Sequence, residues 1–141
     1  MEIIIQLILA TILGALIGVE RELKRKEAGL QTYSLVTLGT CLFTITSFEL
    51  FNSFFGKSGI SFDPSRIIMA VAVGIGFIGA GVIFRQGEGV VGLTTAAALW
   101  ATAAIGIAVG VKLYFLASFV TFLTLLILAG FGEIEERIFK K

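Results

Sequence analysis

Five long apolar runs separated by short polar stretches constrain this 141-residue chain more than any other feature. A helix that crosses the hydrocarbon core of a bilayer needs about 20 residues, within a range of about 17 to 25. Because backbone polar groups inside a bilayer must be satisfied within the chain, runs joined by so few residues can cross only as helices. The sequence therefore predicts an all-α, polytopic membrane bundle of about five transmembrane helices, in one domain over 1–141. The expected helices cover about 2–19, 33–55, 67–84, 93–110 and 113–131.

The composition agrees with a membrane protein and excludes several classes of function. Hydrophobic residues make up 57% of the chain and charged residues 15%, which is more apolar surface than a soluble domain of this size could cover. The sequence contains no histidine, so it lacks the commonest general base and the commonest transition-metal ligand. We therefore expect no enzyme activity, no metal centre and no cofactor. The net charge of +1, without a basic stripe, also predicts no binding to nucleic acid.

The distribution of Lys and Arg predicts how the helices are oriented. With five spans, eight of these cations lie on the side that receives 20–32, 85–92 and the C-terminal tail, and three lie on the other side. Cytoplasmic segments of membrane proteins carry the excess of Lys and Arg. We therefore expect the N-terminus outside and the C-terminus in the cytoplasm. Four spans remain an alternative, because the first and fourth runs are close to the shortest length that crosses a bilayer.

Glycines are unusually frequent in the third apolar run. Gly74, Gly76, Gly79 and Gly81 all lie there, and each costs a helix about 1 kcal/mol relative to Ala. Inside a bilayer, small residues are favoured where the backbones of two helices approach closely. Small residues on several faces of this run imply contact with several helices. We therefore expect the third helix to be the central packing helix of the bundle.

Other residues are expected to support packing in the first and fourth runs. Gly14 and Gly18 are four residues apart, so they form one small face on the first helix. Trp100 is the one large side chain with a polar tip in the fourth run, and we expect it to pack against a neighbouring helix.

The segment 74–79 also matches the G-x-G-x-x-G spacing of dinucleotide-binding sites. That motif requires a strand before it, a helix after it and an acidic residue about 20 positions further on. Here the glycines lie within an apolar span and Glu88 follows too soon, so we reject a nucleotide site.

The start of the third helix carries polar residues that predict a cap and an ion pair. Asp63 followed by Pro64 is typical of a helix N-terminus, with the carboxylate as the cap. Arg66 lies in the first turn, where the helix dipole disfavours a cation. We therefore expect an ion pair between Arg66 and Glu49 or Asp63. The alternative is that Arg66 extends into the lipid headgroups.

A short pattern recurs in the two halves of the chain. LGA, an arginine and GLQT follow one another in the first half, and IGA, an arginine and GLTT follow one another in the second. If this is a parallel repeat of the kind used by transporters, two cytoplasmic corners meet. The candidate functional corner then comprises Glu20, Arg21, Arg85, Thr94 and Thr95. The alternative is that the charged loop after the first helix is only a solvated turn.

Several of these motifs together resemble the MgtC/SapB family of bacterial membrane proteins, over about residues 7–130. The segments that carry the resemblance are GALIGVERE at 14–22, AGLQT at 28–32, DPSR at 63–66, GIGFIGAGVI at 74–83 and GLTTAAALW at 92–100. The resemblance implies a multi-pass protein of the bacterial inner membrane with about five spans. It also implies a link to growth under magnesium limitation and to virulence, exerted through other membrane proteins.

The chain departs from the virulence-associated members of that family at several positions. Those members carry Asn at the position of Thr94 and Cys at the position of Ala101. They also carry Arg-Glu-Gly where this chain has Arg-Gln-Gly at 85–87. Many members have a soluble C-terminal domain, whereas this chain ends about ten residues after the fifth run.

Two functions remain open from the sequence. The first is a non-enzymatic regulator or interaction partner of other membrane proteins, linked to magnesium or ion homeostasis. The second is a transporter or channel for a cation or small solute, against which stands the lack of an acidic residue near the middle of a span. Besides the lipid bilayer, the expected partners are a second copy of the chain in a homodimer and another membrane protein.

Overall fold

The computed structural model describes residues 1–57 and 63–138, apart from the side chains of 135–137. Lys140 and Lys141, which contribute to the predicted cytoplasmic charge, therefore lie outside the described residues. The helices are α1 (Glu2–Leu23), α2 (Leu30–Phe54), α3 (Ser65–Gly81), α4 (Leu93–Gly110), α5 (Tyr114–Leu125) and α6 (Gly132–Ile138). Two short strands, β1 (Phe84–Gln86) and β2 (Gly89–Val91), lie between α3 and α4, and a π-helix, η1 (Leu126–Phe131), joins α5 to α6.

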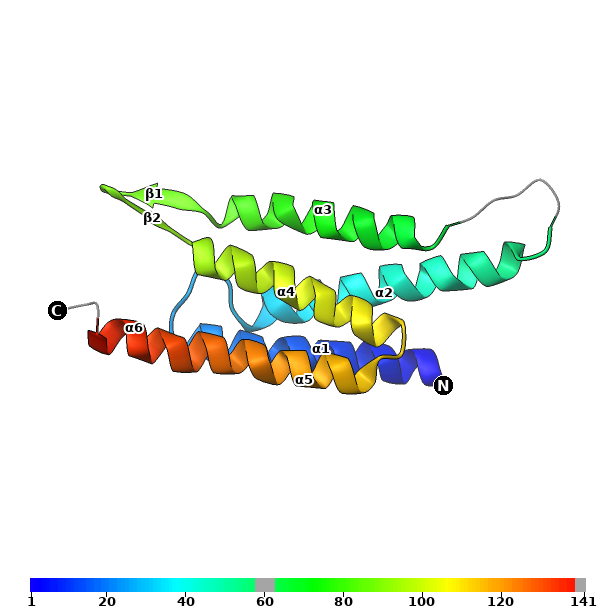
Figure 1. The fold of residues 1–141 in the computed structure, drawn as a ribbon, viewed down its shortest axis with the longest axis horizontal. Helices are drawn as coiled ribbons and strands as arrows, with labels where there is room; N and C mark the ends of the chain where they lie inside the picture. Colours follow the sequence, from blue (N-terminus) through cyan, green and yellow to red (C-terminus); the bar gives the residue numbers. More distant parts are fainter. Residues whose placement is uncertain (58–62, 139–141) are drawn as a thin grey trace.

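From α1 to α5, helices that follow one another in the chain run in roughly opposite directions, and together they form an elongated bundle (Figure 1). α5, η1 and α6 follow one another as one long helix beside α1, and α3 lies along the opposite edge of the bundle. The two ends of the described chain lie at opposite ends of the bundle. We call the end where α1 begins and α4 meets α5 the N-terminal end, and the end that carries β1 and β2 the hairpin end.

Four helical segments are long and apolar enough to cross a membrane. They are Glu2–Leu23, Leu30–Phe54, Leu93–Gly110 and Tyr114–Ile134. α3 is also apolar, but its 17 residues correspond to a length of about 25 Å at 1.5 Å per residue. The prediction of a mostly helical membrane bundle is thus confirmed for the described residues, with α3 at the short limit for a span.

The expectation of an all-α chain is wrong between α3 and α4. β1 and β2 pair as an antiparallel hairpin, with Phe84 opposite Val91 and Gln86 opposite Gly89. The turn contains Gly87 at a φ of 62°, a left-handed conformation that glycine adopts without strain. Glycine for the turn and β-branched residues in β2 are both typical of a hairpin, but a segment this short was expected to be a loop.

The central helix is α4 and not α3. α4 packs against α1, α2, α3 and α5, and half of its 18 residues are buried. In α3, by contrast, only Ile75 and Gly79 are buried, and its main neighbour is α4. Figure 1 shows α3 at the edge of the bundle. The predicted central position of the third helix is therefore wrong within a single chain, because a high glycine content does not by itself specify which helix has neighbours.

Close helix contacts are made by glycines of α1 and α4 against α2. A Cβ atom added at Gly14 would lie 2.5 Å from the carbonyl oxygen of Tyr33, and one at Gly18 would lie 2.6 Å from the Cα of Leu30. Gly106 of α4 makes the same kind of approach, because a Cβ atom added there would lie 2.5 Å from the carbonyl oxygen of Thr37. Real Cβ atoms are not found this close to backbone atoms, so these contacts require glycine.

The glycines of α3 are placed differently. A Cβ atom at Gly79 would make ordinary contact with Ala96 of α4, at 3.5 Å. At Gly74, Gly76 and Gly81 it would meet nothing within 4 Å. These three residues therefore do not support packing between the described helices. Trp100 on α4 is 57% exposed, so its ring is not wedged into the bundle either.

Alanine substitutions distinguish the two kinds of glycine. We expect Gly14→Ala to lower the free energy of unfolding by about 1–3 kcal/mol, because the new methyl group overlaps the backbone of α2. The matched control Gly76→Ala, which points into open space, should leave stability unchanged or raise it by up to about 1 kcal/mol. Thermal or SDS-induced unfolding in detergent micelles measures both, and equal losses in the two variants would contradict the packing described here.

Candidate functional site

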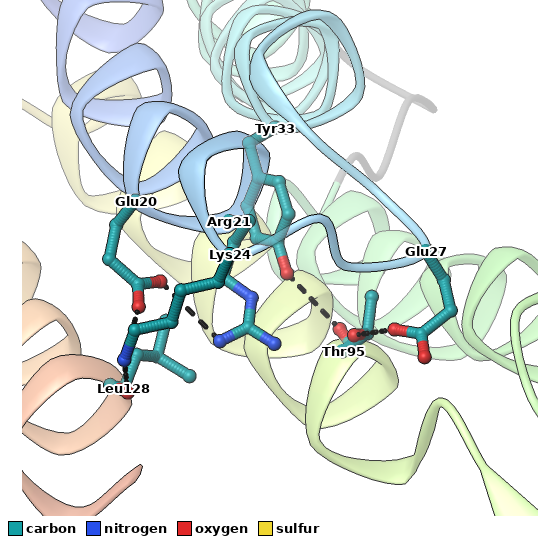
Figure 2. A network of polar contacts seen from close by, with 7 residues as sticks. All are labelled: Glu20, Arg21, Lys24, Glu27, Tyr33, Thr95 and Leu128. Atoms are coloured by element: carbon teal, nitrogen blue, oxygen red, sulfur yellow. Dashed lines mark hydrogen bonds and ion pairs between the residues drawn. The ribbon is translucent and has the colours of Figure 1, made fainter. Parts of the chain in front are cut away.

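A network of polar side chains lies at the hairpin end, where α1 ends (Figure 2). It joins the end of α1, the loop that follows, the first turns of α2 and α4, and the π-helix η1. The residues drawn in the network are Glu20, Arg21, Lys24, Glu27, Tyr33, Thr95 and Leu128. Charged side chains this close to membrane-spanning segments are costly unless they are paired, so the network is the main candidate site of the protein.

Arg21 is the most buried charge of this network. Its relative exposure is 3%, because it follows Gly14, Ile17 and Gly18 on the face of α1 that packs into the bundle. One guanidinium nitrogen lies 3.4 Å from the Oε2 atom of Glu20. The Nε–H group is buried and has no hydrogen-bond acceptor among the described residues. A buried guanidinium with an unused donor is a costly arrangement, which is typical of a functional site.

Lys24 connects α1 to the long C-terminal helix. Its ammonium lies 3.0 Å from the Oε1 atom of Glu20, one helical turn earlier, and donates a hydrogen bond of 3.0 Å to the carbonyl oxygen of Leu128. Leu128 belongs to η1, in which the hydrogen-bond pattern changes from the α to the π type. π-helical turns are rare and frequently lie at functional sites. The Glu20–Lys24 pair therefore links the charged end of α1 to the π-helical turn of the C-terminal segment.

The other side of the network links α2 to α4. The hydroxyl of Tyr33, which is fully buried, donates a hydrogen bond of 3.4 Å to the carbonyl oxygen of Thr95. The Thr95 hydroxyl in turn donates to the carboxylate of Glu27 in the loop after α1. This hydrogen bond is the largest cause that lowers the pKa of Glu27, followed by a hydrogen bond from its own backbone and by the positive charges of Lys26 and Arg21. The Glu27 carboxylate is therefore stabilised in its ionised form.

The start of α2 is capped from α1. The backbone N–H of Leu30 donates a hydrogen bond of 3.0 Å to the Oε2 atom of Glu22. A negative charge is favourable at a helix N-terminus, both as an acceptor and because of the helix dipole. Gly29 makes this possible, since a Cβ atom there would overlap the Glu22 carboxylate.

The structure brings together only part of the predicted corner. Glu20, Arg21 and Thr95 belong to the network, whereas Thr94 is exposed on α4. Arg85 is exposed in β1, and Figure 1 shows the hairpin extending beyond the end of α4, so Arg85 is outside the network.

Four residues of the network were not predicted. They are Lys24, Glu27, Tyr33 and Leu128. The four-residue spacing of Glu20 and Lys24 was a signal for their pairing, but nothing in the sequence indicated that a lysine would reach the carbonyl of a distant π-helix.

At the N-terminal end, the polar residues at the start of α3 make contacts other than the predicted ones. The Asp63 carboxylate accepts hydrogen bonds from the backbone N–H of Ser65 at 2.9 Å and from its hydroxyl at 2.6 Å, and both lower the pKa of Asp63. No ion pair within 4.0 Å joins Arg66 to Glu49 or Asp63 in the described part of the chain. Asp63 instead accepts hydrogen bonds from Ser65. Glu49 and Lys112 line the same cavity.

Comparison with known proteins shows the family of this chain. The model of the MgtC family matches residues 7–137. The chain belongs to the MgtC family. It is 44% identical over 140 residues to the "Putative magnesium transporter YhiD" of Escherichia coli, covering 99% of this chain and 65% of that protein. No solved structure matches the chain significantly.

Two further relatives come from other bacteria. Protein SapB of Bacillus subtilis is 41% identical over 114 residues, covering 80% of this chain and 49% of SapB. Protein MgtC of Salmonella typhimurium is 43% identical over 107 residues, covering 76% of this chain and 42% of MgtC. The chain thus spans less than two thirds of the length of each relative. The resemblance to the MgtC/SapB family noted in the sequence is confirmed.

The link between Thr95 and Glu27 is testable through the pH dependence of stability. Because the pKa of Glu27 is lowered in the folded protein, its contribution to stability is present above the pKa of the unfolded chain and is lost as pH falls through the folded value. We expect Thr95→Val to raise this pKa toward the usual value of a glutamate and to reduce that loss, because the largest of the lowering causes is removed. The control Thr94→Val, at the exposed neighbouring position, should keep the wild-type profile. Thermal unfolding in detergent between pH 3 and 7 measures it (roughly the range that brackets a carboxyl pKa), and identical profiles for Thr95→Val and wild type would contradict the assignment.

Proposed function

We propose that this protein is a non-enzymatic membrane protein of the bacterial inner membrane that binds and regulates other membrane proteins linked to magnesium homeostasis. The observation that supports this proposal most is an apolar groove between α2 and α3, with a volume of about 600 Å³. The groove lies in the part of the bundle where the helices are apolar, and not at the polar network.

The lining of the groove suits a helix better than a small polar solute. It includes Gly39 and Thr40 of α2 and Ala70, Gly74 and Ile78 of α3. Cβ atoms added at Gly39 and Gly74 would meet nothing within 4 Å, so both glycines present open backbone surface. In lipid, helices associate through close packing at small residues, and such a surface gains contact when another transmembrane helix enters.

The position of α3 is consistent with a partner. α3 packs mainly against α4 and only weakly against α2, so one of its sides is left without a neighbour in the described chain. Glycines lower the stability of a helix. At Gly74, Gly76 and Gly81 no close contact within the described chain offsets this cost. A helix from another membrane protein compensates that cost. A second copy of the chain, in a symmetric homodimer, is the simplest assembly that does the same.

We also propose that α3 crosses the membrane, giving five spans with the hairpin end in the cytoplasm. The termini of the described chain lie at opposite ends of the bundle, which agrees with an odd number of crossings (Figure 1). The excess of Lys and Arg in the segments at the hairpin end supports its cytoplasmic location.

The alternative is a transporter or channel for a cation or small solute. It is favoured by the similarity to the "Putative magnesium transporter YhiD". Against it, α3 is a continuous α-helix without the break that exposes backbone carbonyls in many transporters. The groove is lined almost wholly by apolar side chains, which do not solvate an ion.

Filling the groove tests the proposal in cells. We expect Gly74→Leu to fold normally, because the position is open, and to abolish growth support at limiting Mg²⁺ in a strain that lacks its own copy. Gly81→Leu is the matched control, since this glycine lies on the same helix, is equally open and does not line the groove. Immunoblotting of membrane fractions establishes equal amounts of the two variants. Equal growth of Gly74→Leu and wild type would contradict the proposal.

A further inference from the structure

The C-terminal helix changes its hydrogen-bond pattern at the π-helix η1 without being interrupted. Helical backbone angles continue on both sides, with φ −61° and ψ −41° at Leu125 and φ −60° and ψ −42° at Gly132. Figure 1 shows α5, η1 and α6 as one long helix. A π turn holds about one residue more than an α turn, so the residues after it lie one position out of register with α5. One position of an α-helix corresponds to a rotation of about 100° and a rise of about 1.5 Å.

The sequence of η1 does not by itself require a π turn. The segment LILAGF contains neither a proline nor a glycine–serine pair. A Cβ atom added at Gly130 would meet nothing within 4 Å, so no close backbone contact is made there. Irregular turns also arise where a side chain from outside inserts into the hydrogen-bond ladder. Of these causes, the last one fits η1.

The carbonyl of Leu128 is the point where the α pattern is lost. In an α-helix this carbonyl would accept the N–H of Gly132, four residues later. The N–H of Gly132 instead donates to the carbonyl of Ala129. The ammonium of Lys24 takes its place, with a hydrogen bond of 3.0 Å to the Leu128 carbonyl oxygen. Two donors therefore compete for one acceptor: the N–H of Gly132 and the ammonium of Lys24.

The Lys24 ammonium is held at this position from both sides. It lies 3.0 Å from the Oε1 atom of Glu20, whose side chain is only 13% exposed. On the other side it lies close to Gly132, where an added Cβ atom would be 3.4 Å from Nζ. Hydrogen bonds from an ionised donor are stronger than those between neutral groups. The ammonium therefore competes successfully with the N–H of Gly132 while Glu20 holds it in place.

We propose that Lys24 sets the register of α6, and that α6 has a second position, which it adopts when the ammonium withdraws. In that second register the Leu128 carbonyl regains the N–H of Gly132 and η1 becomes α-helical. α6 then rotates by about 100° and moves by about 1.5 Å along the helix axis. Each register satisfies the same carbonyl, so the contact with Lys24 decides between two states. The polar network thus couples the end of α1 to the position of α6, independently of the groove between α2 and α3.

A distance between α4 and α6 tests the proposal in the full chain. Nitroxide labels are attached at Leu93→Cys and Ile134→Cys, two exposed positions, and the buried Cys41 is replaced by alanine. Pulsed electron paramagnetic resonance in lipid nanodiscs measures the distance distribution. We expect Lys24→Met to raise the ratio of the second distance to the wild-type distance at least about tenfold, because a hydrogen bond from a charged donor is lost. Lys26→Met removes the same charge from an exposed residue of the same loop and should keep the wild-type distribution.

Deletion of Gly130 distinguishes a change of register from a general loss of structure. In a continuous α-helix with one residue fewer, α6 lies where the π turn places it now. The deletion should therefore restore the wild-type distance in the Lys24→Met chain, and it should leave the distance unchanged in the chain that keeps Lys24. A shifted distance after the deletion alone would overturn the proposal, and this variant does not depend on the folding of Lys24→Met. An unchanged distance in Lys24→Met, or equal shifts in Lys24→Met and Lys26→Met, would overturn it as well.

Discussion

Close packing of α1 and α4 against one face of α2 is the interaction on which the rest of the structure depends. Gly14 on α1 and Gly106 on α4 let both backbones approach that of α2 near Thr37. In a bilayer the hydrophobic effect does not drive helices together, so such close contacts must supply the stability. The hydroxyls of Thr37, Thr40 and Thr44 donate to carbonyls of their own helix, which leaves this face without unpaired polar groups.

This arrangement decides where function can reside. Because α1, α2 and α4 form the tight core, α3 remains at the edge with an open apolar groove, and the charged residues are confined to the two ends. At the hairpin end Arg21 is buried beside Glu20, and Lys24 reaches the π-helix of the C-terminal segment. At the N-terminal end the Gln6 amide donates to a carbonyl of the last turn of α4, and Glu2 pairs with Lys112. The groove is apolar, whereas the two ends carry the ion pairs of the described chain.

The helices were predictable from the sequence because apolar runs of this length have few alternatives in a membrane. Burial was less predictable, since a glycine such as Gly74 has the same sequence signature whether its neighbour is a helix of the same chain or of another. Thr95 was a candidate because GLTT at 92–95 repeats GLQT at 29–32. Lys24 was not, because its contribution depends on a carbonyl more than a hundred residues away. The hairpin was missed because its strands are only three residues long.

The central functional claim is that the chain acts by contact with other membrane proteins and does not itself move ions. The most direct test is Mg²⁺ flux into liposomes that contain the purified full chain and a trapped magnesium indicator, compared with liposomes that contain no protein. We expect equal rates in the two preparations over the tested Mg²⁺ concentrations. A flux above the protein-free rate that saturates with Mg²⁺ would contradict it.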